Sequence, residues 1–83
     1  MGEKVFVALC KDEVVEYVRM HLGENISRED VYVVWLCKTL QNNKALLSTP
    51  LLDGMYYEMT YNGDKQELYV DAYKKMDNYT VVV

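Results

Sequence analysis

The stretch MYYEMTYNGDKQELYVDAYK, residues 55–74, decides the fold of this chain. Successive side chains of a β-strand point to opposite faces, and here apolar residues alternate with polar or aromatic ones on both sides of Asn62-Gly63. An Asn-Gly dipeptide is typical of the tight turn that joins two antiparallel strands. The stretch therefore predicts a β-hairpin with strands over residues 55–61 and 66–74.

The alternation sorts this hairpin into two faces of different chemistry. The apolar face, with Ala45 and Leu47 added by inference, comprises Met55, Tyr57, Met59, Leu68, Val70 and Ala72. The opposite face mixes aromatic and polar side chains, namely Tyr56, Glu58, Thr60, Glu67, Tyr69, Asp71 and Tyr73. We expect it to be extended by Tyr32, Val34, Leu36, Lys38, Lys44 and Leu46. A helix should cover the apolar face and leave the other uncovered.

The register of the hairpin depends on the length of its turn. A two-residue turn at Asn62-Gly63 would set Glu58 opposite Glu67, a like-charge pair that destabilises a sheet. A four-residue loop over residues 62–65 places Tyr69 opposite Glu58 instead. Both registers keep the same residues on the same face, because they differ by an even number of residues.

Two more strands are expected upstream of the hairpin. Residues 31–40 are dense in β-branched and aromatic side chains, which predicts a strand buried on much of both faces. Gln41-Asn42-Asn43 has the composition of a turn, and residues 44–49 supply the partner strand. Pro50 to Gly54 ends that strand.

Residues 3–22 predict an amphipathic helix with Gly23 as its C-terminal cap. Its apolar stripe consists of Phe6, Cys10, Val14, Tyr17, Val18, His21 and Leu22. A second interpretation makes residues 5–9 a short strand and begins the helix near Asp12. Residues 27–30 are compatible with one helical turn. The whole is one α+β domain over residues 1–83, an N-terminal helix packed on a four-stranded antiparallel meander.

The tail over residues 77–83 ends in Val81-Val82-Val83. The alternatives for this tail are an added edge strand, a swap onto a neighbouring molecule and a frayed end. Unpaired strand-forming residues of this kind promote aggregation, so we expect the tail to pair.

The composition of the 83 residues argues against an enzyme. The chain holds eight Tyr but one Phe, one Trp and one His, and His21 has no partner that would make it a general base. Cys10 and Cys37 form neither a CxxC motif nor a cluster with histidine. We expect buried free thiols, with a disulfide as the alternative, and no catalytic residue, metal site or cofactor.

The charge and hydropathy patterns bear on partners and location. Thirteen acids and nine bases give a net charge of −4, which opposes attraction to nucleic-acid phosphates. No apolar run reaches the length of about 20 residues that a membrane helix needs, and the N-terminus lacks the features of a signal peptide. We expect a cytoplasmic protein with no membrane partner.

Two segments carry a family resemblance, DVYVVWLCKTLQNNKALLST over residues 30–49 and DGMYYEMTYNGDKQELYVDAYKK over residues 53–75. They resemble a group of small uncharacterised proteins encoded by phages and prophages of Gram-positive bacteria. The resemblance implies an accessory protein made in the host bacterial cell during infection or lysogeny. It implies no catalytic residues.

Together these observations predict a partner-binding face made of tyrosines and acids. Its candidate residues are Tyr32, Tyr56, Glu58, Glu67, Tyr69, Asp71 and Tyr73. Tyrosine provides a large contact area at a small entropic cost, and acids add electrostatic selection. The expected partner is a bacterial host or defence protein, which binding would inhibit. The alternatives are a module that binds single-stranded nucleic acid and a structural protein that forms a homodimer.

Overall fold

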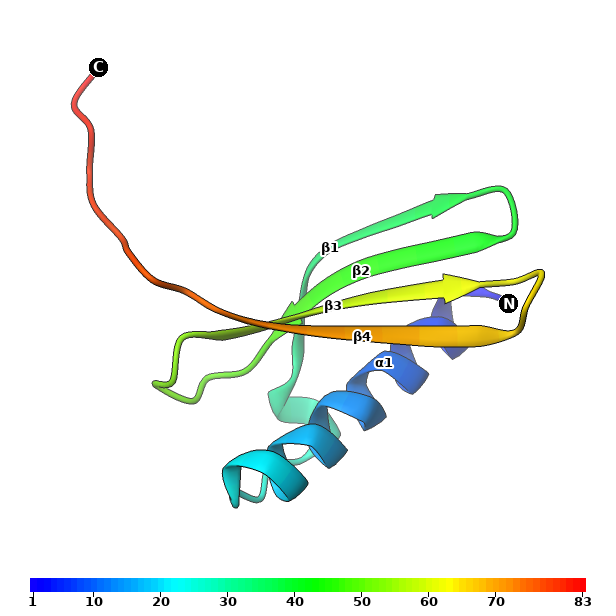
Figure 1. Ribbon diagram of the computed structural model, residues 1–83, viewed down its shortest axis with the longest axis horizontal. Helices are drawn as coiled ribbons and strands as arrows, with labels where there is room; N and C mark the ends of the chain where they lie inside the picture. Colours follow the sequence, from blue (N-terminus) through cyan, green and yellow to red (C-terminus); the bar gives the residue numbers. More distant parts are fainter.

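A four-stranded antiparallel sheet lies across one N-terminal helix in the computed structural model, which describes residues 1–83 (Figure 1). The strands run in the order β1-β2-β3-β4. Their bounds are β1 Tyr32–Thr39, β2 Asn42–Ser48, β3 Met55–Asn62 and β4 Glu67–Lys74. Helix α1 spans Glu3–Tyr17, the π-helical segment η1 spans Val18–Leu22, and the short 3-10 helix η2 spans Arg28–Asp30. The expected α+β fold, a helix on an antiparallel meander, is confirmed.

Helix α1 begins at Glu3, so the alternative strand over residues 5–9 is wrong. The buried stripe has one residue per turn, namely Phe6, Cys10 and Val14 of α1 and Val18 of η1. His21 and Leu22, expected on the same stripe, are exposed because the wider turn of η1 rotates them away from it. Gly23 ends the segment with φ of 67°, a left-handed conformation that glycine adopts without a steric penalty.

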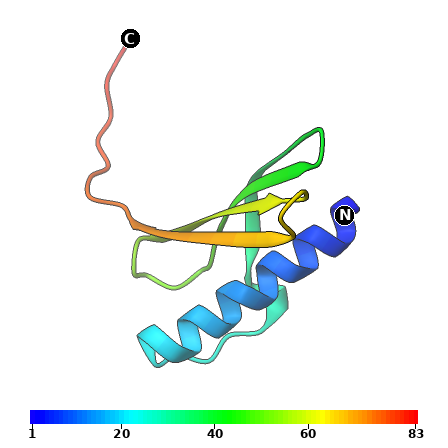
Figure 2. The same ribbon diagram turned by 45° about the vertical axis from the view of Figure 1, so that its right-hand side comes forward.

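The hydrophobic core lies between this stripe and the middle of the sheet (Figure 2). From the sheet it takes Ala45 and Leu47 of β2 and Tyr57 and Met59 of β3, all fully buried. These four residues were all expected on the face that the helix covers. Val70 of β4 lies on the same face and is nevertheless 39% exposed. One helix therefore covers β2 and β3 and leaves the edge strand β4 largely open.

The register of the β3–β4 hairpin differs from both predicted registers. Asn62 pairs with Glu67 around a four-residue turn over residues 63–66, so Glu58 faces Asp71. The Asn62 side chain selects this turn, because its Oδ1 accepts hydrogen bonds from the backbone N–H groups of Asp64 and Lys65, both at 3.1 Å. The difference from each prediction is an even number of residues, so every hairpin residue stays on its expected face.

Strand β1 contains a bulge that the sequence analysis did not anticipate. Val33 pairs with Leu47 and Trp35 with Leu46, which leaves Val34 without a partner. The extra residue moves Leu36 and Lys38 to the helix side, so their expected place on the opposite face is wrong. The Lys38 ammonium accordingly donates a hydrogen bond to the Met1 carbonyl at the start of the helix, at 3.3 Å.

Strand β1 is also more exposed, and β2 longer, than expected. Most side chains of β1 are exposed because it is an edge strand beyond the main reach of α1, so its expected burial on both faces is wrong. Strand β2 begins at Asn42 rather than Lys44, after a tight turn in which Leu40 has φ of 55°. The residues 42–43, expected in the turn, extend the ladder with β1 instead.

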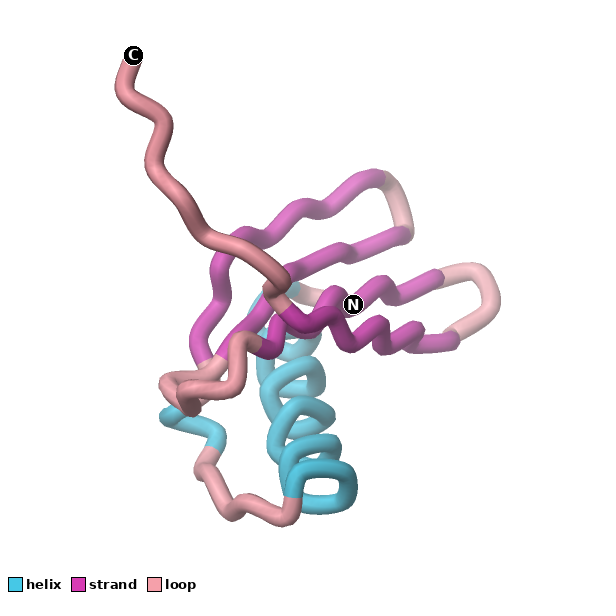
Figure 3. The backbone as a smooth tube through the Cα atoms, turned by 60° about the vertical axis from the view of Figure 1, so that its left-hand side comes forward, coloured by secondary structure: helices cyan, strands magenta, loops and turns pink.

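Residues 75–83 form no helix or strand and extend away from the end of β4 (Figure 3). The N–H of Lys75 donates to the carbonyl of Gly54 at 2.7 Å, and this is the last bond of the ladder. Val81, Val82 and Val83 are exposed. Within the single chain, the expected pairing of the tail is therefore not present.

A Gly63→Ala substitution should destabilise the fold by about 1–3 kcal/mol, because overpacking distorts a tight contact. A Cβ on Gly63 would lie 2.4 Å from the carbonyl oxygen of Gln41, so the two hairpin turns would have to separate. Thermal unfolding measures the effect. Gly2→Ala is the matched control, since its Cβ meets nothing within 4 Å. Equal melting temperatures for the two variants would contradict this packing.

Tyr57→Phe should raise the free energy of unfolding at neutral pH by about 1 kcal/mol, since an unpaired buried hydroxyl destabilises a core. The Tyr57 hydroxyl is buried without a hydrogen-bond partner. Burial is the main cause that raises the pKa of Tyr57 to about 12, and the nearby charges of Asp53 and Tyr17 act in the same direction.

The raised pKa of Tyr57 also predicts a pH dependence. The folded state holds this proton more tightly than the unfolded chain, whose tyrosine pKa is about 10. The contribution of this proton to the free energy of unfolding is therefore fully present below a pH of about 10, and it is lost as the pH rises toward 12. Denaturant unfolding between these pH values should show a smaller loss for Tyr57→Phe than for the native chain. Parallel losses would refute the assignment to Tyr57.

Candidate functional site

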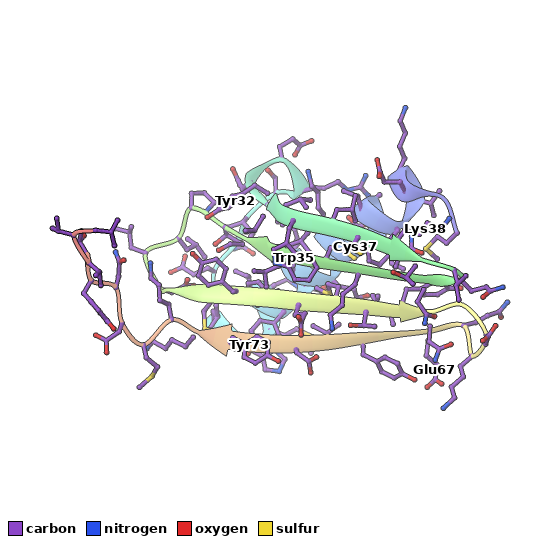
Figure 4. The ribbon with its side chains drawn as sticks, turned by 90° about the horizontal axis from the view of Figure 1, so that it is seen from above. Tyr32, Trp35, Cys37, Lys38, Glu67 and Tyr73 are labelled. Atoms are coloured by element: carbon purple, nitrogen blue, oxygen red, sulfur yellow. The ribbon has the colours of Figure 1, made fainter.

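The open face is the side of the sheet turned away from α1, and its residues follow from the strand pairing (Figure 4). Residues directly opposite one another in neighbouring strands share a face. Three rows therefore cross the sheet from β1 to β4, namely Tyr32–Ser48–Tyr56–Tyr73, Trp35–Leu46–Glu58–Asp71 and Cys37–Lys44–Thr60–Tyr69. Glu67 lies beyond the third row, opposite Asn62. All seven candidate residues of the sequence analysis are on this face.

The first row places three tyrosines at one end of the open face. Tyr32 is 48% exposed and Tyr73 is 54% exposed. Ser48 between Tyr32 and Tyr56 is small and buried, and its hydroxyl donates to the Met55 carbonyl at 2.8 Å. The surface of this row is therefore uneven, because the rings of Tyr32 and Tyr56 project on either side of the small Ser48.

Two hollows flank Tyr56 in this row. One, of about 410 Å³, lies between Tyr32, Tyr56 and the loop over residues 49–54. The other, of about 370 Å³, lies between Leu46, Tyr56 and Tyr73. Both are of a size that accepts a side chain of a partner, and Lys75 lines both.

The middle row combines an exposed aromatic ring with two acids. Trp35 is 40% exposed, and the bulge in β1 puts it on this face. Glu58 and Asp71 stand directly opposite each other, an arrangement that like charges disfavour. The Lys44 ammonium lies 3.7 Å from a carboxylate oxygen of Glu58 and offsets part of this repulsion. The row thus presents negative charge beside an apolar surface.

The third row carries polar groups and a free thiol. The Tyr69 hydroxyl donates a hydrogen bond to the Glu67 carboxylate at 3.4 Å. Desolvation is the main cause that raises the pKa of Tyr69, and the negative charge of Glu67 is the second. Cys37 lines a hollow of about 350 Å³ together with Trp35 and Lys44. Cys10 and Cys37 are both free, as expected, but Cys37 is exposed rather than buried because of the bulge.

The remaining groups with the potential for chemistry are the metal-ligating side chains and the single histidine. No group of three or more His, Cys, Asp or Glu side chains lies close enough together to hold a metal ion. His21 stacks on Tyr17 within the helix, with ring centroids 4.3 Å apart. The open face itself offers aromatic rings, carboxylates and one ammonium on rigid strands.

Sequence reasoning missed Trp35 and Cys37 as members of this face. Both follow the bulge at Val34, which shifts the alternation of β1 by one residue. No glycine lies in β1 to mark the bulge. The alternation of the sequence therefore carried no signal that could have found these two residues.

Comparison with known proteins adds one finding. Residues 7–83 match a family described as "Family of unknown function (DUF6275)". Comparisons with curated proteins and with solved structures returned no match. No helix of the chain combines the length and the apolar character that crossing a membrane requires.

The two cysteines should differ in reactivity toward iodoacetamide. Cys37 is exposed, whereas Cys10 is buried. Burial is the main cause that raises the pKa of Cys10 to about 12, and the negative charge of Glu13 is the second. Because the thiolate is the reactive form, we expect one fast thiol in the folded protein and a second only after unfolding. Mass spectrometry identifies the modified residue. Cys37→Ser should remove the fast reaction, and fast labelling of Cys10 in that variant would show that the helix does not shield it.

Proposed function

We propose that this chain, which belongs to the DUF6275 family, is a non-enzymatic binding protein that engages a bacterial protein through the open face of its sheet. The observation that carries the proposal is the exposure of Tyr32, Trp35 and Tyr73 on one uncovered face, where Tyr32 and Trp35 stand on the edge strand β1 and Tyr73 on the edge strand β4. Large aromatic side chains of this kind dominate the energetics of protein interfaces. Nothing else in the chain covers them.

The strands make this face a preorganised one. Tyr56 is held by its neighbours Ser48 and Tyr73 in the ladder, so its position is largely set before a partner arrives. Binding through such rings loses little conformational entropy. The hollows beside Tyr56 give a partner places to insert side chains.

The charges of the open face indicate which partner it fits. Within the three rows, the two acids Glu58 and Asp71 outnumber the one lysine, Lys44; Glu67 adds a third acid just beyond them, and the chain as a whole carries a net charge of −4. Complementary potentials raise the rate of encounter and select among partners. We propose a partner with basic groups around an apolar surface.

The biological setting of the proposal comes from the resemblance of residues 30–75 to phage and prophage proteins. In that setting the protein acts in the cytoplasm of a bacterial host as an accessory protein. Its binding inhibits a host or defence protein by covering a working surface of that protein. A basic surface that would otherwise hold a nucleic acid is one such surface, although a net charge of −4 is modest for a mimic of DNA.

A second candidate function is binding of single-stranded nucleic acid. Tyrosines on a sheet can stack on bases, and Lys74 and Lys75 line the hollow beside Tyr56 and Tyr73. The acids Glu58 and Asp71 in the next row would repel the phosphates. The protein-binding proposal is favoured for that reason.

Replacing Tyr56, Tyr69 and Tyr73 together by serine tests the proposed face. We expect the triple variant to fold and to lose capture of the partner, with an affinity at least about 30-fold lower, because the loss of each ring removes contact energy with the partner. Affinity capture from the lysate of a bacterial host with mass spectrometry identifies the partner, and calorimetry with the purified partner measures the affinity. Circular dichroism checks the fold.

Tyr79→Ser is the control, because Tyr79 is an exposed tyrosine of the tail outside the open face. The control should bind as the native chain does. Unchanged affinity of a folded triple variant would exclude this face. Titration with labelled oligonucleotides at low and high salt tests the second candidate, and tight binding that weakens steeply with salt and needs the tyrosines would favour it over a protein partner.

A further inference from the structure

The two edge strands of the sheet differ in how well they are protected against pairing with another chain. Strand β1 is interrupted by its bulge at Val34, a feature that disrupts edge-to-edge pairing. Strand β4 pairs with β3 through eight consecutive positions without an irregularity, so its outer edge is straight. Its Val70 is 39% exposed on the helix side, since α1 packs against β2 and β3. The free edge of β4 is thus regular and partly apolar.

The backbone of β4 shows which residues could bond to a further strand. Lys75 donates its N–H to Gly54, the residue opposite it, so this is a hydrogen-bonded pair of the antiparallel ladder. Such pairs alternate with pairs that do not bond to each other. A residue in a pair that does not bond to β3 turns its N–H and C=O groups away from β3, toward the free edge of the sheet. In β4 these residues are Leu68, Val70, Ala72 and Lys74.

We propose that β4 pairs antiparallel with β4 of a second copy, about a two-fold axis at Val70. A continuous sheet with such an axis sets each outward-turned residue opposite another one and keeps the two open faces on the same side. This requirement leaves few registers. The axis must pass through one of the residues of β4, and the charges of the strand then discriminate between them.

The charges select the axis at Val70. An axis at Asp71 would set two Asp71 carboxylates opposite each other, and an axis at Tyr69 would set Glu67 opposite Asp71. An axis further toward either end shortens the paired segment. The axis at Val70 pairs residues 67–73, which is all of β4 except Lys74, and no like charges are opposed within this segment.

The pairs that result are complementary on both faces. On the helix side, Val70 meets its own copy and Leu68 meets Ala72, so the apolar surface that α1 leaves open is covered. On the open face, Tyr69 meets Asp71 and Glu67 meets Tyr73, which allows hydroxyl–carboxylate hydrogen bonds. The dimer would carry eight strands and two open faces on one side. This inference does not rest on the proposed function, because the strand pairing is made by backbone groups at the edge of β4; the two proposals share only the side chains of β4 on the open face.

Sedimentation velocity of the full chain tests the dimer. From micromolar to millimolar concentration we expect a shift from monomer to dimer. Val70→Lys would oppose two ammonium groups at the axis and should weaken self-association by at least about tenfold. The matched control is Val34→Lys, an exposed valine of the other edge strand, which should dimerise like the native chain. A monomer at every concentration, or a Val70→Lys variant that dimerises normally, would overturn the proposal.

Disulfide trapping in a Cys37→Ser background tests the register and does not depend on the lysine variant. At the axis, two Val70→Cys residues would have Cα atoms about 5.5 Å apart, within the range of a disulfide. Asp71→Cys is the control, because its two copies are offset by two residues along the strands. Oxidation should trap the Val70→Cys dimer. Preferential trapping of Asp71→Cys would contradict the axis at Val70.

Discussion

The packing of one helical stripe on the middle of the sheet is the interaction on which the rest of this structure depends. Phe6, Cys10, Val14 and Val18 meet β2 and β3 and enclose the fully buried residues of both strands. A single helix is narrower than four strands, which lie about 4.8 Å apart. It therefore cannot cover the edge strands, and it leaves the whole opposite face uncovered.

Because the core is small, its aromatic and polar residues have a large effect on the stability of the fold. Tyr57 lies at its centre, against Tyr17 at a ring-centroid distance of 5.3 Å in an edge-on arrangement. Its hydroxyl and Asn43 Oδ1 are buried without partners, which opposes part of the packing energy. Outside the core, Arg28 forms two hydrogen bonds of 2.8 Å with Asp12 and ties the loop before β1 back to α1. The ends of the sheet are thus anchored to the helix by few interactions.

The two uncovered surfaces have different chemistry, and this difference separates their proposed roles. The open face presents aromatic rings and acids in rows, which suits a partner of complementary charge. The edge of β4 presents free backbone groups and a short apolar row, which suits another strand. A dimer through the edge would double the open face without covering it. The two proposals are therefore compatible and can be tested separately.

The sequence by itself determined the element order, the helix, the presence of a turn next to Asn62 and the faces of β3 and β4. These features follow from local alternation and turn chemistry, so the six candidate residues of the open face that lie on β3 and β4 could be placed from the sequence. Only the tertiary structure decided the register of the hairpin, the bulge at Val34 and the exposure of Val70. The register depends on the hydrogen bonds that Asn62 Oδ1 accepts within the turn. The bulge and the exposure of Val70 depend on how strands and helix fit together in space, where a shift of one residue, as in β1, moves Trp35 and Cys37 to the other face.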